Sequence, residues 1–221
     1  MFTGTTAAFT VAAGMLMFSA FMYYDDEGYV LISLKNFAEH GGLYRDVYSQ
    51  YGPFPFVFYY GLHTLGFPFT HVAGRLLTLA AWAGCALCCA ALVRQATRSF
   101  ILTLAVLAAV FPYLWIMVSE PSHPGSLVAV AVAVAAAAGY RAIAHERPRT
   151  WALTIGAVAA VLALTKINVG GFVVLSGLAW ILLHHENNGV RRWAPVVLAV
   201  GSVLVPLALM RPMLGVEWIQ T

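Results

Sequence analysis

Three consecutive carboxylates, Asp25, Asp26 and Glu27, directly follow an apolar run at residues 5–22. Such acids can cap a helix, because Asp is a favoured N-cap and carboxylates in the first turn interact well with the positive end of the helix dipole. Capping explains one or two acids, whereas three adjacent carboxylates repel each other and are harder to ionise where water is scarce. The alternative is that one acid is a general base at a membrane surface, which deprotonates the hydroxyl or amine of an acceptor.

The composition indicates the class of protein in which such a base would work. Of the 221 residues, 61% are hydrophobic and 10% are charged, against about 25% charged residues in ordinary soluble domains. With a mean hydropathy of +0.81, this is typical of a polytopic membrane protein. The net charge of +3 is spread over many loops and gives no argument for a nucleic-acid partner. The three cysteines lie among Ala and Leu in one apolar segment, which favours small core residues over metal ligands.

Seven apolar segments are candidates for membrane-spanning helices, which need about 20 residues, or fewer when they are partly interfacial. They are residues 5–22, 72–93, 100–118, 125–143, 151–165, 169–183 and 194–210. The fifth and sixth are separated only by TKINVG, so they are either two short spans that meet at a tight turn or one interrupted hairpin with a buried polar tip. We take the first as an uncleaved helix, because no Lys or Arg precedes it as in a signal peptide.

Seven of the twelve Lys and Arg residues lie in three loops that alternate along the chain. They are Arg94, Arg98, Arg141, Arg147, Arg149, Arg191 and Arg192. Because cytoplasmic loops are enriched in these cations, the N-terminus is expected in the cytoplasm and the long segment 23–71 outside. We therefore expect an integral protein of the cell inner or plasma membrane, with its acid cluster on the outer face.

The first outer loop, 23–71, is the only long stretch outside the predicted spans. From Glu27 to Gly41, apolar residues recur at helical spacing with polar residues opposite, which predicts a helix on the membrane surface. Glycine can adopt the left-handed conformation that ends helices, so Gly41 and Gly42 are expected to end it. Prolines then start a second, aromatic helix at 54–67 that suits the interface. The expected fold is all-α, with about seven transmembrane helices and two outer-face juxtamembrane helices.

The order of these parts is similar to that of a known family. The matching motifs are DEGY at 26–29, GGLYRDV at 41–47, YGPFPF at 51–56, GRLLTLAAW at 74–82, SEPSHPG at 119–125 and LTKINVG at 164–170. They resemble the membrane-embedded GT-C glycosyltransferases, most closely the family that includes protein mannosyltransferases and lipid A aminoarabinose transferase. The resemblance covers nearly the whole chain and is most specific in the order span, acid pair, surface helix, GGLYRD turn, Pro-aromatic helix and span beginning with Arg.

This resemblance implies an inverting glycosyltransferase. Such an enzyme transfers the sugar of a polyprenyl-phosphate-linked donor to a lipid, glycan or protein acceptor, with inversion of configuration at the anomeric carbon. Asp26 matches the first acid of the family's pair and is expected to be the general base, with Asp25 as the alternative because DDE offers two registers. Glu27 is then an orienting or metal-proximal partner. Arg75 and Lys166 are expected to hold the donor phosphate. The alternative for both is an anchor in the lipid headgroups.

Four further residues are expected to bind the substrate. Glu120 and His123 share the SEPSHPG loop on the same side as Asp26. Together with the acid cluster they are suited to a divalent cation, but we favour a role in positioning the substrate and assign no metal ligand. Tyr44 and Tyr51 are expected to stack on a sugar, with interfacial anchoring as the alternative.

Members of the family are usually several hundred residues long, with further spans after the seventh. Residues 1–221 resemble their shared N-terminal module, so we expect a single module that is truncated relative to the family. One alternative is that a second polypeptide completes the site. The alternative function is a non-catalytic or partner-dependent membrane module. A small transporter is the weaker rival, because the acids lie at the surface and no internal repeat is visible.

Overall fold

The computed structural model describes residues 2–19, 26–117, 120–144 and 148–184, together with Trp193 and Val200. Within these ranges the chain is helical and forms no strand. The helices are α1 (Phe2–Ser19), α2 (Asp26–His40), α3 (Pro53–Thr64), α4 (His71–Thr97), α5 (Phe100–Met117), α6 (Gly125–Ala144), α7 (Pro148–Ala163) and α8 (Ile167–His184). The all-α class expected from the sequence is confirmed for this part of the chain.

The helix bounds follow the apolar segments closely. Six of the seven expected spans coincide with α1, α4, α5, α6, α7 and α8. The seventh, 194–210, lies outside the described residues apart from Val200. The fifth and sixth are separate helices joined by a turn at 164–166, where the side chain of Lys166 is exposed rather than buried at the tip of a hairpin. Helices α2 and α3 match the two expected juxtamembrane helices.

By length and composition, α4 is the one described helix that is long and apolar enough to cross a membrane. Five further apolar segments, within α1, α5, α6, α7 and α8, are shorter than this length. Association with a membrane therefore has support from one helix, and the number of spans stays a prediction.

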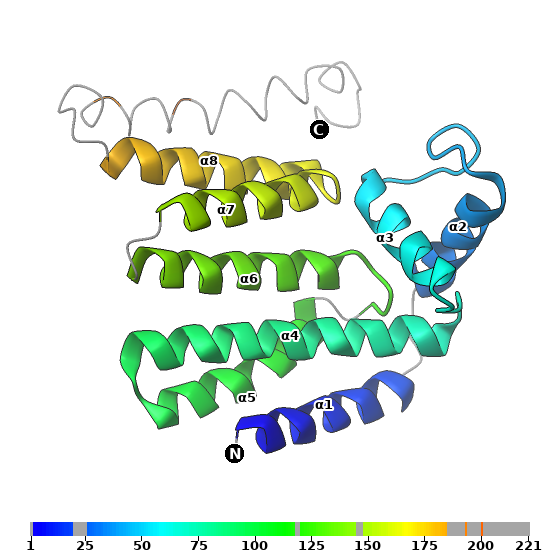
Figure 1. The fold of residues 1–221 in the computed structure, drawn as a ribbon. Helices are drawn as coiled ribbons and strands as arrows, with labels where there is room; N and C mark the ends of the chain where they lie inside the picture. Colours follow the sequence, from blue (N-terminus) through cyan, green and yellow to red (C-terminus); the bar gives the residue numbers. More distant parts are fainter. Residues whose placement is uncertain are drawn as a thin grey trace, which may run out of the picture. The chain divides into compact units, whose positions relative to one another are not determined.

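The main core forms around α4, which packs against α1, α5 and α6, while α6 packs in turn against α7 (Figure 1). Trp82 of α4 is fully buried at its centre, with its ring edge-to-face on Trp115 of α5 at 6.2 Å between centroids. Cys85 is buried in the same cluster, and its Sγ lies 3.8 Å from the carbonyl oxygen of Ala129 on α6. A small side chain at this position lets the two helices approach closely, as the sequence predicted for the cysteines.

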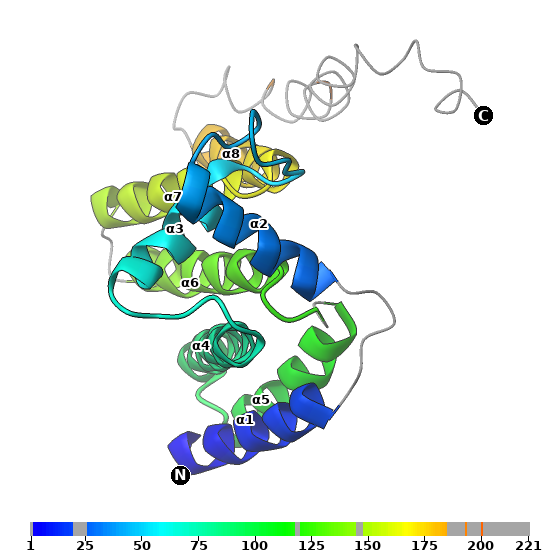
Figure 2. The same ribbon diagram turned by 90° about the vertical axis from the view of Figure 1, so that its right-hand side faces the viewer.

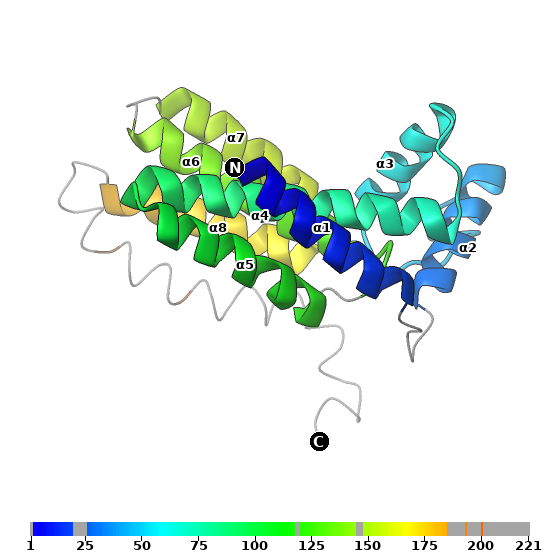
Figure 3. The same ribbon diagram turned by 90° about the horizontal axis from the view of Figure 1, so that it is seen from below.

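Helices α2 and α3 gather at one end of α4 (Figures 2 and 3). Their apolar faces form a second cluster in which Leu34 and Val30 of α2 meet Phe56 and Tyr59 of α3. These side chains bury the faces that the helical periodicity predicted. The two helices thus form a small layer, which packs on α4 through α2.

The loop at 41–52 connects this pair of helices and is shaped by two glycines. Gly41 and Gly42 have φ angles of 66° and 65°, in the left-handed region that favours glycine. The carbonyl oxygen of Gly42 then accepts hydrogen bonds from the amides of Arg45 and Asp46, at 2.9 and 2.7 Å. This tight turn brings the chain back toward Pro53, which starts α3.

The chain forms two compact units, Met1–Gly170 and Gly171–Thr221. The first contains α1 to α7 and the initial turn of α8. Within the second, the described part of α8 has large exposed apolar side chains at Phe172, Val174 and Leu178. All of the residues discussed below as a site belong to the first unit.

Candidate active site

A buried carboxylate at the start of α2 joins three helices. Glu27 accepts hydrogen bonds from Arg75 of α4, with Nε 3.1 Å from Oε1 and Nη2 2.8 Å from Oε2. His71 Nδ1 lies 3.2 Å from the same carboxylate. Arg75 Nη1 also donates to the carbonyl oxygen of Met17 at 2.8 Å, and its guanidinium lies over the ring of Phe18 in α1. We call Glu27, Arg75 and His71 the clamp.

The clamp holds the backbone beside Asp26, the first residue of α2. Asp26 is exposed whereas Glu27 is buried, so two adjacent acids have opposite environments. A buried carboxylate needs a paired cation, which Arg75 supplies for Glu27. Asp26 remains exposed to solvent, so its carboxylate is accessible from outside the protein. Asp25, the alternative base, lies outside the described residues.

The loop at 120–124 is anchored through Ser122. Its backbone N–H donates to Thr78 Oγ1 of α4 at 2.9 Å, and its carbonyl oxygen accepts from Tyr59 Oη of α3 at 3.3 Å. Ser122 is fully buried with a φ of 65°, which is uncommon for a residue other than glycine. Gly74 permits this approach, because a Cβ there would collide with Ser122 Oγ. The loop is thus held in one conformation by α3 and α4.

His123 of this loop meets Tyr51 of the 41–52 loop. His123 Nε2 lies 2.6 Å from Tyr51 Oη, and the two rings are edge-to-face at 5.3 Å between centroids. The backbone N–H of Gly125 donates to His123 Nδ1 at 2.9 Å, so Nδ1 is an acceptor and the ring proton is on Nε2. Nε2 therefore donates to Tyr51 Oη, which accepts a second hydrogen bond from Gln50 Nε2 at 3.0 Å.

Asp26 and Glu120 form a carboxyl pair beside these rings. Burial raises the pKa of Glu120, and the charge of Asp26 and a hydrogen bond between the two side chains raise it further. Burial lowers the pKa of His123, and the positive charge of Lys166 lowers it further, against an opposing effect of Asp26. Burial also raises the pKa of Tyr51. Glu120 therefore keeps its proton more readily than an ordinary carboxyl group, and the neutral forms of the neighbouring imidazole and phenol are favoured.

A pocket of about 510 Å³ lies between the 41–52 loop and the turn before α8, and Tyr51 is among its lining residues. Its polar lining residues are Tyr44, Ser49, Gln50, Tyr51, Thr165, Lys166 and Asn168. Among the lining residues that the structure describes, Lys166 is the only charged one, and neither acid of the carboxyl pair is included. We call this cavity the Lys166 pocket.

Backbone hydrogen bonds join the two walls of the Lys166 pocket. The N–H of Gly52 donates to the carbonyl oxygen of Thr165, and that of Phe54 to the carbonyl oxygen of Leu164, both at 2.9 Å. A Cβ at Gly52 would collide with the Leu164 carbonyl oxygen, so the close contact requires glycine. The 41–52 loop is thereby docked on the turn before α8.

The structure therefore brings most of the predicted site residues together. Asp26, Glu120, His123, Tyr51 and Lys166 come from four separate segments and act on one another electrostatically. Tyr44 lines the Lys166 pocket, and its Oη donates to the carbonyl oxygen of Tyr51 at 2.9 Å.

Arg75, expected from the sequence to hold the donor phosphate, is bound to Glu27 in the clamp and is not among the described lining residues of the Lys166 pocket. Glu27, expected as an orienting or metal-proximal partner of Asp26, is buried and paired with Arg75.

Sequence reasoning missed the residues that support this site. They are Gln50, Gly52, Tyr59, Thr78 and Gly125. Gly125 and Gly52 act through their backbone amides, and the pattern of side-chain types in the sequence does not reveal such contacts. The buried Thr78 is a polar residue within an apolar helix, and that contrast is the one signal by which it could have been found.

A divalent cation needs several ligating side chains close together. In the part of the chain that the structure describes, no three His, Cys, Asp or Glu side chains gather closely enough to hold a metal ion. We therefore assign no step of the chemistry to a metal.

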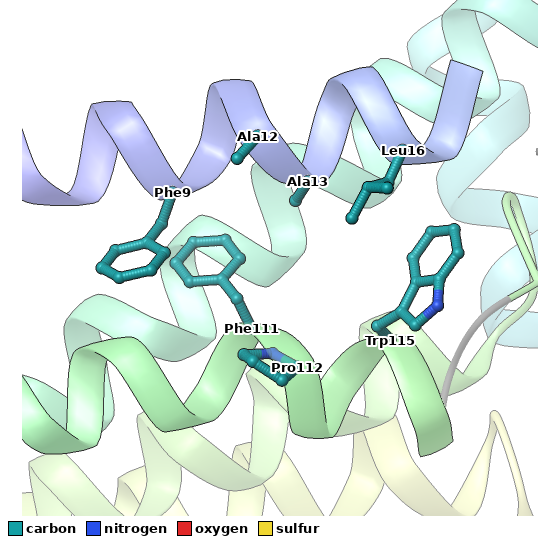
Figure 4. A pocket seen from close by; sticks show the side chains of 7 residues that line it. All are labelled: Phe9, Ala12, Ala13, Leu16, Phe111, Pro112 and Trp115. Carbon is teal, nitrogen blue, oxygen red and sulfur yellow. The ribbon is translucent and has the colours of Figure 1, made fainter. Parts of the chain in front are cut away.

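An apolar crevice of about 250 Å³ lies between α1 and α5 (Figure 4). Phe9 of α1 stacks on Phe111 of α5 at 5.8 Å between centroids, and Leu16 and Trp115 line the other end. Leu16 directly precedes Met17, the residue that Arg75 contacts. The crevice thus extends along α1 toward the clamp, and its lining is hydrocarbon and aromatic.

Comparisons with known proteins give no relative for this chain. No protein-family model, no curated protein and no solved structure matches it. The function must therefore be inferred from the residues and their geometry.

Proposed function

We propose that this protein is an inverting membrane glycosyltransferase, with a polyprenyl-phosphate-linked sugar as donor and Asp26 as general base. The observation that carries the proposal is the position of Asp26. It is an exposed acid beside a second carboxyl, Glu120. Its charge also acts on Tyr51, which lines a pocket whose one charged residue, among those described, is Lys166. An acid and a cation so arranged suit a reaction in which a proton is removed and a phosphate departs.

In this reaction an acceptor oxygen or nitrogen bonds to the anomeric carbon of the sugar. The bond from that carbon to the phosphate oxygen breaks, and its electron pair leaves with the phosphate. Asp26 takes the proton of the acceptor, and Glu120 stabilises the pair by sharing that proton. Phosphate is already a stable anion, so no general acid is needed for its departure. Lys166 stabilises the negative charge that develops there.

Arg75 is proposed to act as a positioning residue rather than a phosphate ligand. Most of its donors are directed at Glu27 and Met17. By holding Glu27, it fixes the first turn of α2 and hence the Asp26 carboxylate. A base must stay within hydrogen-bonding distance of the proton it removes, so this rigidity has a direct effect on rate.

We propose a membrane location in which the apolar helices cross the cell inner or plasma membrane, with the N-terminus in the cytoplasm and α2 and α3 on the outer face. The length of α4 and the cation-rich loops support this arrangement. The apolar crevice between α1 and α5 would then face lipid, and its lining suits the hydrocarbon chain of the donor. Its end near Leu16 leads toward the clamp and Asp26.

The test is transfer by the purified protein from a panel of polyprenyl-phosphate sugars. Asp26→Asn should lower the rate by about 10²-fold or more, the usual contribution of a general base, with helix content and membrane insertion unchanged. Glu39→Gln is the matched control, because Glu39 is an exposed acid on the same helix, with Lys35 4.0 Å away. Full activity after replacement of both Asp25 and Asp26 by Asn would overturn the assignment of the base.

A further inference from the structure

The hydroxyl oxygen of Tyr51 accepts two hydrogen bonds, which leaves its proton for a further partner. The amide of Gly125 donates to His123 Nδ1, so the ring proton is on Nε2 and is donated to Tyr51 Oη. Gln50 Nε2 donates to the same oxygen at 3.0 Å, so both acceptor positions of the hydroxyl are occupied. None of the hydrogen bonds formed within the described ranges uses the Tyr51 proton. Its two neighbours therefore fix Tyr51 as a hydrogen-bond donor.

The Tyr51 hydroxyl lies beside the carboxyl pair. His123 Nε2 is 2.6 Å from Tyr51 Oη and 3.8 Å from Glu120 Oε2, so both oxygen atoms are close to one nitrogen atom. The charges of Asp26 and Glu120 act on Tyr51, and Asp26 is hydrogen-bonded to Glu120. The side chains of His123 and Glu120 are 20% and 34% exposed, so a ligand can reach them from solvent. A molecule bound at Asp26 can therefore meet the Tyr51 donor.

The direction of the hydrogen bond from His123 to Tyr51 is fixed at neutral pH. Burial raises the pKa of Tyr51, so the phenol keeps its proton. A second proton on His123 would have to bind Nδ1, where the Gly125 amide already donates, and burial also lowers the pKa of this ring. Tyr51 can therefore offer its proton to a ligand without a change in its neighbours.

We propose that the Tyr51 hydroxyl donates a hydrogen bond to the acceptor atom that Asp26 deprotonates, and that His123 positions Tyr51 for this contact. The inference rests on the proposed function and names the group that holds the reacting atom of the acceptor. Tyr51 thus binds the acceptor through its hydroxyl rather than by stacking its ring on a sugar. The acceptor atom is held between a carboxylate that takes its proton and a phenol that donates to it.

The two side chains together select the chemical class of the acceptor. A hydroxyl oxygen gives its proton to Asp26, accepts from Tyr51 with one lone pair and attacks the anomeric carbon with the other. A neutral amine has a single lone pair, which the attack itself requires, and the lone pair of an amide nitrogen is delocalised into its carbonyl group. As the new bond to carbon forms, the carbon–oxygen bond to phosphate breaks and its electron pair leaves with the phosphate, while Tyr51 keeps its proton. We therefore expect alcohols to be better acceptors than amines or amides.

The experiment measures sugar transfer by the full 221-residue chain in liposomes, from the panel of polyprenyl-phosphate sugars. Two matched sets of acceptors present a hydroxyl, an amine and an amide on one scaffold. The first set is dodecanol, dodecylamine and dodecanamide, and the second is a short peptide with serine, diaminopropionate or asparagine at its centre. In at least one set, we expect the hydroxyl acceptor to react at least tenfold faster than the other two.

The contribution of the Tyr51 hydroxyl is tested by Tyr51→Phe, which keeps the ring against His123. The KM for the hydroxyl acceptor should rise about tenfold, the usual effect of one lost hydrogen bond, while the KM for the donor stays unchanged. Tyr48→Phe is the matched control, because Tyr48 is an exposed tyrosine of the same loop. Circular dichroism of each variant checks that the helices are retained.

The role of His123 as a positioning residue is tested by two variants. His123→Leu removes the donor to Tyr51, so the phenol is free to turn and the KM for the hydroxyl acceptor should rise severalfold. His123→Gln retains an N–H donor and should restore most of the wild-type value. A role of His123 in folding alone would give both variants the same acceptor KM in their folded fractions, and that result would contradict the proposed positioning.

The outcomes separate this inference from the proposed function. Transfer to the amine or amide at the rate of the hydroxyl acceptor overturns the inference and leaves the glycosyltransferase standing. An unchanged acceptor KM in Tyr51→Phe has the same meaning, as does a rise in the KM for the donor alone. Absence of transfer from every donor to every acceptor counts against the glycosyltransferase and therefore against the acceptor contact as well.

Discussion

At the scale of single residues, His123 is the group whose state is most constrained by its surroundings. Its Nδ1 accepts from the Gly125 amide, so a proton added there would face another donor. Burial and the charge of Lys166 lower its pKa. The folded protein therefore binds a proton at His123 less readily than the unfolded chain does.

This constraint predicts a loss of stability in mild acid. Because the pKa of His123 is lower in the folded state, its contribution is fully present above the ordinary histidine pKa of about 6.5 and is lost as the pH falls through the folded value. Glu120 has a raised pKa, so its contribution is lost in the opposite direction, as the pH rises. Thermal unfolding of the chain in detergent, measured from pH 8 to pH 5, should show a steeper decline than in His123→Gln. Equal slopes for the two proteins, with His40→Gln as the exposed control, would contradict the prediction.

The clamp allows a second prediction at this scale. Glu27→Leu leaves the partly buried Arg75 without its partner and should lower the free energy of unfolding by about 3 kcal/mol. Adding Arg75→Met to that variant should restore part of the loss, because no charge is then left uncompensated. The exposed pair Lys35 and Glu39 is the control, and its double replacement should change stability by less than about 1 kcal/mol. Denaturant titration in detergent is the measurement, and a double variant less stable than Glu27→Leu would contradict this account.

The sequence identified single residues better than it identified their partners. Lys166 stood out because an ionisable group between two apolar segments is costly, and Glu120 because its loop lies on the same side as Asp26; the structure places both near His123 and Tyr51. Arg75 stood out at the start of a predicted span, but its partner Glu27 is far away in the sequence and the pairing has no local signal. The tautomer of His123 depends on a backbone amide, which no side-chain pattern encodes.

At the scale of elements, the contact between the 41–52 loop and the turn before α8 joins the two walls of the Lys166 pocket. Gly52→Ala should disrupt it, because the added Cβ would collide with the Leu164 carbonyl oxygen. We expect a loss of about 1–3 kcal/mol in stability. Gly61→Ala on α3 is the control, since nothing lies within 4 Å of its added Cβ and alanine favours a helix. Thermal unfolding of both variants provides the measurement, and equal behaviour would show that the contact is dispensable.

Helix positions were largely predictable because the signals for them are local. Apolar stretches gave α4 and the other long helices to within a few residues, and Gly41 and Pro53 marked the limits of α2 and α3. The docking of the 41–52 loop was not predictable, because it is made of backbone hydrogen bonds between segments distant in sequence.

At the scale of the whole molecule, the alternation of cation-rich loops predicts which ends of the helices face the cytoplasm. A cysteine introduced as Tyr48→Cys should react with a membrane-impermeant maleimide in intact cells, whereas Thr97→Cys should react only after the membrane is opened. Both positions are exposed. The background needs Cys85, Cys88 and Cys89 replaced by alanine, since these are the native thiols. Labelling of Thr97→Cys alone in intact cells would reverse the proposed orientation.

The contact between Gly52 and Thr165 also has a consequence for the order in which the protein is made. A chain is synthesised from its N-terminus, so Asp26 and Tyr51 emerge well before the turn that carries Lys166. A ribosome-bound chain that ends at α6 has the proposed base but only one wall of the cavity. We therefore expect biogenesis itself to delay activity, because the nascent protein gains Lys166, the proposed partner of the departing phosphate, only after α7 has been made.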